Sequence, residues 1–256
     1  MNNAKKSHLY DAWIMFKRCL LVSMRNPEAL LTAIVTPFFL MILFGSLFGS
    51  IIDIGDFNYI DYIVPGIILQ SIAQASQHSA INVATDMTKG MIDRFRTMSI
   101  SKYAVIIGHT GAGAVRGLIS TIIIIATAFI IGFRPQANFN NWILVICLLL
   151  LINIVISLFA VLCGLASKTV EGSTGLLFPL FILRFMSSGF APTDTMSGAI
   201  KWISSVQPMT PLIDSTRALM LNLPLGNTLL VALSWSVALI VITFIVATLV
   251  YNRKIA

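Results

Sequence analysis

Apolar residues form long uninterrupted runs along this chain, and several runs are long enough to cross a bilayer. A bilayer core about 30 Å thick needs about 20 apolar residues in a helix that rises about 1.5 Å per residue. The pattern predicts six transmembrane helices, at about residues 28–52, 59–81, 104–131, 142–166, 173–190 and 226–251. Because runs such as 122–125 and 148–152 do not alternate apolar with polar residues, we expect helices rather than barrel strands.

The segment 1–27, before the first run, predicts an interfacial helix on the inner leaflet. Asp11, Arg18 and Arg25 recur every seven residues on one side of such a helix. Apolar residues recur at helical spacing on the other side, namely Leu9, Trp13, Phe16, Leu20 and Met24. A helix with one apolar and one charged face lies in the membrane surface. An ordinary basic segment ahead of the first span is the alternative.

Composition agrees with an all-α, polytopic membrane protein consisting of one transmembrane domain. The chain has 256 residues, of which 57% are hydrophobic and 11% charged. A soluble domain carries about 25% charged residues, so too few are present here to cover a surface that faces water. The pieces outside the runs are too short for a sizeable soluble domain. The three cysteines lie in or near apolar runs without close pairing, so we expect no metal or redox site.

The basic residues predict the orientation. Twelve of the 17 Lys and Arg residues fall on one side of the predicted spans, while the other side has only Arg134, Lys201 and Arg217. Since Lys and Arg favour the cytoplasmic side of short loops, both termini are expected in the cytoplasm. The net charge of +7 follows from this topology, and a nucleic-acid partner is not needed to explain it.

Motifs for catalysis or nucleotide binding are missing from the sequence, so we expect neither an enzyme nor a cofactor in this chain. A phosphate-binding loop needs Gly before its Lys, but Ser167 precedes Lys168. Hydrolase signatures of the H-E-x-x-H and G-x-S-x-G types are also missing. The glycine pairs Gly45 with Gly49 and Gly113 with Gly117 predict close helix packing, either within one chain or between two.

The inner loop 82–103 mixes apolar and charged residues. Asp93, Arg94 and Arg96 alternate with Met91, Ile92, Phe95, Met98 and Ile100. This mixture fits a short helix that contacts a partner, and equally a solvated basic loop. Asp86 and Asp93 are expected to balance the nearby Lys89, Arg94 and Arg96.

Two arginines fall inside the predicted spans. Arg184 lies in the shortest span, which Pro179 interrupts, and Arg116 lies near the middle of the third. An Arg at mid-membrane costs about 3 kcal/mol to insert, so both are candidates for a translocation path or a partner contact. In the structural alternatives, Arg184 snorkels from a span that ends early and Arg116 pairs with a carboxylate.

The outer segment 191–225 predicts a cap. Ile200, Trp202, Ile203 and Val206 suggest a short helix at the outer surface, followed by a turn bounded by Pro208 and Pro211. Trp202 suits an anchor at the level of the headgroups.

Taken together, ordered segments along nearly the whole chain resemble the ABC type-2 permease family, and within it the daunorubicin-resistance-like drug exporters. The segments that carry the resemblance are Asn26-Pro-Glu28 with Pro37 and Phe44-Gly45, Tyr62-Ile-Val-Pro-Gly66, Gly90-Met-Ile-Asp-Arg-Phe-Arg-Thr-Met-Ser-Ile-Ser101, Gly132-Phe-Arg134, and Ser188 to Arg217 with its Gln207-Pro-Met-Thr-Pro211. Ser99 and Ser197 depart from the family pattern, which has Pro at both places.

The resemblance implies a homodimer or paired permease in a bacterial cytoplasmic membrane, seated on separate ATPase subunits that bind ATP and Mg²⁺. The inner loop would be the coupling helix, with Asp93, Arg94, Phe95, Arg96 and Met98 at the ATPase. The first and fifth spans would line the dimer interface and the export path, for which the candidates are Gly45, Gly49, Arg116, Pro179 and Arg184. The extracellular cap would include Pro192, Trp202, Pro208 and Pro211.

The expected function is therefore ATP-driven export of a hydrophobic or amphiphilic substrate such as a drug, peptide or lipid. A glycan exporter of the same family, a gradient-driven carrier or channel, and a non-transporting membrane partner remain alternatives. Proton-coupled carriers usually need carboxylates within the membrane, and no Asp or Glu lies well inside a predicted span.

Overall fold

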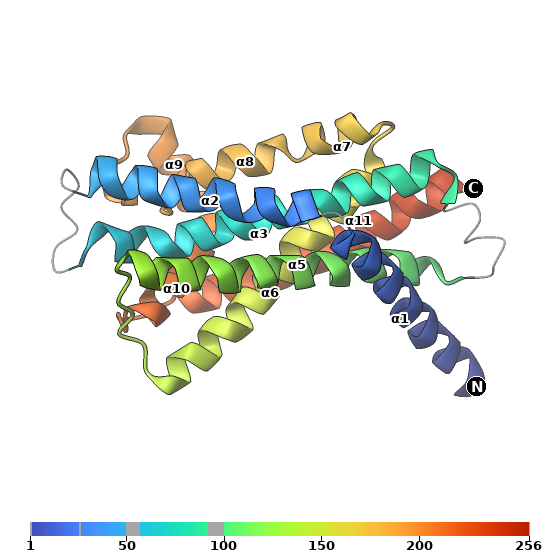
Figure 1. The fold of residues 1–256 in the computed structure, drawn as a ribbon, viewed down its shortest axis with the longest axis horizontal. Helices are drawn as coiled ribbons and strands as arrows, with labels where there is room; N and C mark the ends of the chain where they lie inside the picture. Colours follow the sequence, from blue (N-terminus) through green and yellow to red (C-terminus); the bar gives the residue numbers. More distant parts are fainter. Residues whose placement is uncertain (1, 26, 50–56, 92–99, 256) are drawn as a thin grey trace.

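The computed structural model describes residues 2–25, 27–49, 57–91 and 100–255, and these residues form helices and connecting loops with no strand. Most of the helices lie side by side in an elongated bundle, while α1 leaves the bundle obliquely (Figure 1). The long helices are α1 (Asn2–Met24), α2 (Pro27–Phe48), α3 (Tyr59–Thr88), α5 (Lys102–Ile131), α6 (Phe139–Ala166) and α11 (Thr228–Ile255). The short helices are α7 (Val170–Leu176), α8 (Phe178–Phe185), η1 (Thr193–Thr195), α9 (Gly198–Val206) and α10 (Met209–Met220). The all-helical fold expected from the sequence is confirmed.

Three of the described helices are long and apolar enough to cross a membrane: α5, α6 and α11. The helix α3 is more polar, yet between Tyr59 and Ala73 nearly every side chain is buried. Because its neighbours α2, α5 and α6 pack around it, α3 exposes little of its surface to lipid. Its position explains why its composition need not resemble that of a lipid-facing span.

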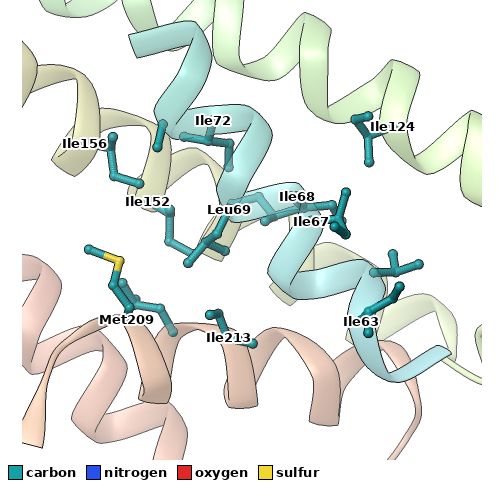
Figure 2. Close-up of a cluster of buried hydrophobic side chains, with 14 of the residues drawn as sticks. Ile63, Ile67, Ile68, Leu69, Ile72, Ile124, Ile152, Ile156, Met209 and Ile213 are labelled. Carbon is teal, nitrogen blue, oxygen red and sulfur yellow. The ribbon is translucent and has the colours of Figure 1, made fainter. Parts of the chain in front are cut away.

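The main core lies between α3, α6 and α10. Figure 2 shows Leu69 and Ile72 of α3 on the side of Ile152 and Ile156 of α6, with Ile213 of α10 below them in this view. All five side chains are at most 1% exposed. This packing fixes α10 against the centre of the bundle.

Glycines allow several helices to approach closely within this chain. A Cβ at Gly108 would lie 2.7 Å from the Cβ of Met15, so α1 contacts the backbone of α5 there. A Cβ at Gly113 would lie 2.4 Å from Ser79 Oγ and 2.8 Å from Ser157 Oγ. The glycine pair of α5 therefore packs against α3 and α6 of its own chain.

The other glycine pair makes no such approach in the described chain. A Cβ at Gly45 would lie at an ordinary 3.7 Å from Ile60, and Gly49 is exposed. Unlike the pair in α5, Gly45 and Gly49 mark no close approach to another helix among the described residues.

The fifth predicted span, 173–190, differs from expectation in length and in the place of its break. The chain forms α7 and α8, which meet at Leu177, and α8 ends at Phe185. Pro179 lies in the first turn of α8, where its missing N–H leaves no helical hydrogen bond unmade. The break thus precedes the proline, and the helix ends earlier than hydrophobicity suggested.

The outer segment also differs from the expected surface cap. The short helix α9 is present, and Trp202 on it is 67% exposed. Instead of a turn after Pro208, however, the chain begins α10, and Pro211 lies in its first turn. Since Leu212 and Ile213 are 0% and 1% exposed, α10 belongs to the bundle core rather than to its surface.

Candidate functional site

A charged cluster joins α1 to the end of α3. Both guanidinium Nη atoms of Arg18 donate to the carboxylate of Asp86, at 2.7 and 2.8 Å. His109 of α5 places Nε2 3.2 Å from Asp86 Oδ2. Three helices therefore meet at one carboxylate. Asp86 does not balance the loop residue Lys89, as the sequence had suggested, because its oxygens face α1 and α5.

The pKa values of Arg18 and Asp86 reflect the ion pair between them. Burial raises the pKa of Asp86, but the hydrogen bonds from Arg18 and the neighbouring His109 outweigh burial and hold that pKa well below its ordinary range. The hydrogen bond to Asp86 in turn raises the pKa of Arg18. Both groups are therefore charged at neutral pH, and the bridge is a charge-assisted, bidentate one.

A second contact joins α1 to the start of α5. The backbone N–H of Ser101, the residue before α5, donates to Asp11 Oδ2 at 3.3 Å. Since α3 ends at Thr88 and α5 begins at Lys102, α1 holds both stems of the connection between them. The candidate coupling residues Asp93, Arg94, Phe95, Arg96 and Met98, and Ser99 with them, lie outside the described residues.

Arg116 is a buried connector between three helices. Its Nη1 donates to Ser23 Oγ of α1 at 2.6 Å, its Nη2 to Ser79 Oγ of α3 at 2.5 Å, and its Nε to the Ala75 carbonyl at 3.3 Å. The side chain is 3% exposed. The sequence had suggested that Arg116 pairs with a carboxylate, but its acceptors are two hydroxyls and a carbonyl. All three of its guanidinium nitrogens donate to groups within the chain.

Arg184 is equally buried but poorly partnered. Its Nη1 donates to the Gln70 carbonyl of α3 at 3.0 Å, while Nε and Nη2 have no hydrogen-bond partner among the described residues. The guanidinium carbon lies 4.3 Å from the centre of the Phe181 ring. Although its helix ends early, Arg184 is 2% exposed and does not snorkel to the surface. Among the buried arginines that the structure describes, Arg184 is the one with unpartnered guanidinium nitrogens.

Pro179 lines an apolar cavity of about 140 Å³ between α6, α8, α10 and α11. Leu180 and Leu183 of α8, together with Pro208 and Met209 at the start of α10, form part of its wall. The structure therefore places Pro179 and Pro208 on the same cavity, and neither Arg116 nor Arg184 is among the residues that line it.

The end of the bundle where α3 begins contains a polar cluster that the sequence did not reveal. Arg217 of α10 donates through Nε to the Tyr62 carbonyl at 3.1 Å, through Nη2 to the Ser188 carbonyl at 2.6 Å and through Nη1 to Asp214 at 2.5 Å. Tyr62 also donates its hydroxyl to the Ser188 carbonyl at 2.9 Å. The only sequence signal was the spacing of Asp214 and Arg217, which places them on one face of a helix.

Beside this cluster the backbones of α3 and residue 189 are in direct contact. A Cβ at Gly66 would lie 2.5 Å from the Gly189 carbonyl oxygen and 2.7 Å from its Cα. The segment after α8 is thereby fixed to the start of α3. Pro192 follows this segment, immediately before η1.

Comparison with known proteins assigns the family. The family model described as ABC-2 type transporter matches residues 10–221, which is most of the chain. The chain belongs to the ABC-2 type transporter family. It is therefore a polytopic membrane protein and the membrane component of an ABC transporter.

Named relatives support the drug-resistance subgroup. The daunorubicin resistance ABC transporter permease protein DrrB1 of Streptomyces coeruleorubidus is 26% identical over 219 residues, covering 85% of this chain and 75% of the relative. The probable doxorubicin resistance ABC transporter permease protein DrrC of Mycobacterium tuberculosis is 21% identical over 252 residues, covering 98% and 91%. The inner membrane transport permease YadH of Escherichia coli K12 is 27% identical over 195 residues, covering 74% of each chain.

Two helices of this ABC-2 permease carry apolar faces that its own described residues leave uncovered. On α2, Leu31, Val35 and Phe39 are between 55% and 62% exposed and recur every four residues. On α8, Phe178 is 62% and Phe185 47% exposed. These faces are available to lipid or to a second protein chain.

Proposed function

We propose that the chain is the transmembrane subunit of an ATP-driven exporter in a bacterial cytoplasmic membrane. It pairs with a second permease subunit, either a copy of itself or a relative, and is driven by separate cytoplasmic ATPase subunits. The substrate is hydrophobic or amphiphilic. Family membership and the drug-resistance names of two relatives support this proposal.

The observation that carries the proposal is the attachment of α1 to both stems of the 89–101 connection. Arg18 bridges to Asp86 on one stem, and Asp11 accepts from Ser101 on the other. A force applied to this connection by a partner would therefore move α1, α3 and α5 together. Arg116, which joins the same three elements through Ser23 and Ser79, would carry the motion deeper into the bundle.

The path for the substrate is proposed at the seam between two permeases, where the exposed faces of α2 and α8 meet their counterparts. Leu31, Val35 and Phe39 supply an apolar face on α2, and Phe178 and Phe185 supply an apolar wall on α8. Arg184 lies behind that wall, and its Nε and Nη2 have no partner among the described residues, so a rotation of α8 would bring a cation to the seam.

Charge exchange in the connection tests the coupling role. The double change Arg94→Glu with Arg96→Glu is expected to abolish copurification with the ATPase subunits, because an acidic loop would replace a basic one. The exposed Lys201→Glu on α9 serves as the control and should leave copurification unchanged. If the double variant still assembles with the ATPase and hydrolyses ATP normally, the 89–101 connection does not couple the permease to the ATPase.

A further inference from the structure

A polar pocket of about 280 Å³ lies between α10 and the first turns of α11, with α9 beside it. The residues that line it are Ser205 of α9, Thr210, Pro211 and Asp214 of α10, Asn227, and Thr228, Val231 and Trp235 of α11. Unlike the apolar cavity beside Pro179, this pocket has a carboxylate, an amide and three hydroxyls in its wall. The side chains around it therefore indicate a ligand with a polar group.

Asp214 gives the pocket its negative charge. The Ser188 hydroxyl and Arg217 Nη1 both donate to Asp214 Oδ1, at 2.6 and 2.5 Å. Asp214 Oδ2 accepts no hydrogen bond from the described residues, and the Asp214 side chain is 34% exposed. Arg217 does not line the pocket, and its other nitrogens donate to the carbonyls of Tyr62 and Ser188. The pocket is thus lined by the negative partner of this ion pair and not by the positive one.

Two of the hydroxyls in the wall can act only as acceptors. Ser205 donates its hydrogen to the Trp202 carbonyl at 2.7 Å, and Thr228 donates its hydrogen to the Leu225 carbonyl at 2.5 Å. A hydroxyl has one hydrogen and two lone pairs, so each of these oxygens keeps a lone pair for a ligand. Together with Asp214, they favour a ligand that is positively charged and carries hydrogen-bond donors.

The pocket lies where α11 enters the bilayer. This helix has 28 residues and is about 42 Å long, which exceeds the bilayer core of about 30 Å. Its first turn, with Thr228, therefore lies among the headgroups, and Trp235 lies two turns deeper, near the acyl chains. Trp is common at this boundary, and the face of an indole ring attracts a cation.

We propose that this pocket binds the protonated primary amine of an amphiphile in the leaflet at this end of the bundle. The ammonium group donates to Asp214 Oδ2 and to the hydroxyl oxygens, and the apolar tail extends along α11 past Val231 and Trp235. An anionic headgroup would be repelled by Asp214. Two kinds of molecule have the required chemistry, namely phosphatidylethanolamine and a free single-chain amine.

Native mass spectrometry of delipidated permease in detergent tests this proposal without the ATPase, so the result does not depend on transport. Dioleoyl phosphatidylethanolamine should occupy one strong site in the wild-type protein. Dioleoyl phosphatidylcholine keeps the charge but has no N–H donor, so it should bind about tenfold more weakly, as expected for hydrogen bonds to a charged group. Dioleoyl phosphatidylglycerol, which is anionic, should not occupy the site. Equal binding of the three lipids would overturn the proposal.

Titration with dodecylamine distinguishes the two sources of the amine. If dodecylamine displaces phosphatidylethanolamine, the site recognises the amine that both molecules share. If dodecylamine occupies the strong site and phosphatidylethanolamine does not, the ligand is a free amine. If neither molecule binds, the pocket is not an amine site.

Two variants locate the amine. Asp214→Asn removes the charge and should weaken binding of phosphatidylethanolamine at least tenfold. Because this change also disturbs Arg217, Trp235→Leu is the second variant, and it should weaken binding about fivefold through the lost cation–π contact. Its matched control is Trp202→Leu, which removes an indole that is 67% exposed and does not line the pocket, and which should leave binding unchanged. If Trp235→Leu binds as tightly as its control, the amine does not lie in this pocket.

Discussion

Arg116 and Arg184 have the same charge and nearly the same burial, but their hydrogen bonding differs. Arg116 donates from three nitrogens to α1 and α3, whereas Arg184 donates from one. A buried cation is stabilised only when its donors are satisfied, and unused donors are costly. We therefore assign Arg116 to holding the helices together and treat Arg184 as a residue that stability alone does not explain.

Replacement of each arginine by Met should separate these roles. Arg116→Met is expected to destabilise the protein by about 2–4 kcal/mol, because it removes three hydrogen bonds between helices. Arg184→Met should cost at least 1–2 kcal/mol less, roughly the difference of two neutral hydrogen bonds. Thermal or denaturant unfolding in detergent gives both values. Equal losses at the two positions would contradict the assignment.

At the scale of elements, one helix contact depends on the absence of side chains. The contact of Gly66 with Gly189 fixes the segment after α8 to α3, and backbone atoms on both sides cannot yield to an added methyl group. This contact also explains how α10, which follows that segment, is held beside the core.

Gly66→Ala should therefore destabilise the protein by about 1–3 kcal/mol, the usual cost of overpacking. Gly175→Ala on α7 is the matched control, since a Cβ there meets nothing within 4 Å. The control should be neutral or more stable by up to about 1 kcal/mol, because Ala favours helices over Gly. The unfolding midpoints of the two variants measure these effects. If Gly66→Ala is as stable as the wild-type protein, the backbones at residues 66 and 189 are not in close contact.

The attachment of α1 is the other element-level feature that can be measured. Asp86→Asn should destabilise the protein by about 2–4 kcal/mol, because it leaves Arg18 without its carboxylate in a partly buried place. Asp194→Asn removes the carboxylate of an exposed pair with Lys201 and should change stability by less than about 1 kcal/mol. If both changes had similar effects, the Arg18–Asp86 bridge would be an ordinary surface pair.

For the whole molecule, the sequence predicted what depends on local composition. The long apolar helices α5, α6 and α11 followed from hydrophobicity, and the family followed from ordered short segments. The sequence did not predict the helix α10, because Thr210, Asp214 and Arg217 are residues typical of a surface. That its apolar side is buried becomes clear only from its packing on α3 and α6. Polar composition cannot reveal that Arg217 finds its acceptors on Tyr62 and Ser188.

Pairings between distant segments were also beyond sequence reasoning. Arg18 and Asp86 are 68 positions apart, and closer charges offered Asp86 plausible partners. The same holds for Ser23 as a partner of Arg116, 93 positions away. The orientation of the bundle, its number of membrane crossings and its assembly with other subunits stay predictions.

The central claim is that separate ATPase subunits drive export through this permease. Inverted membrane vesicles containing the permease and its ATPase subunits should accumulate an amphiphilic drug against its gradient when ATP is added. Vanadate should stop accumulation, and a protonophore should not. Uphill transport that continues without any ATPase and collapses with the proton gradient would contradict the account.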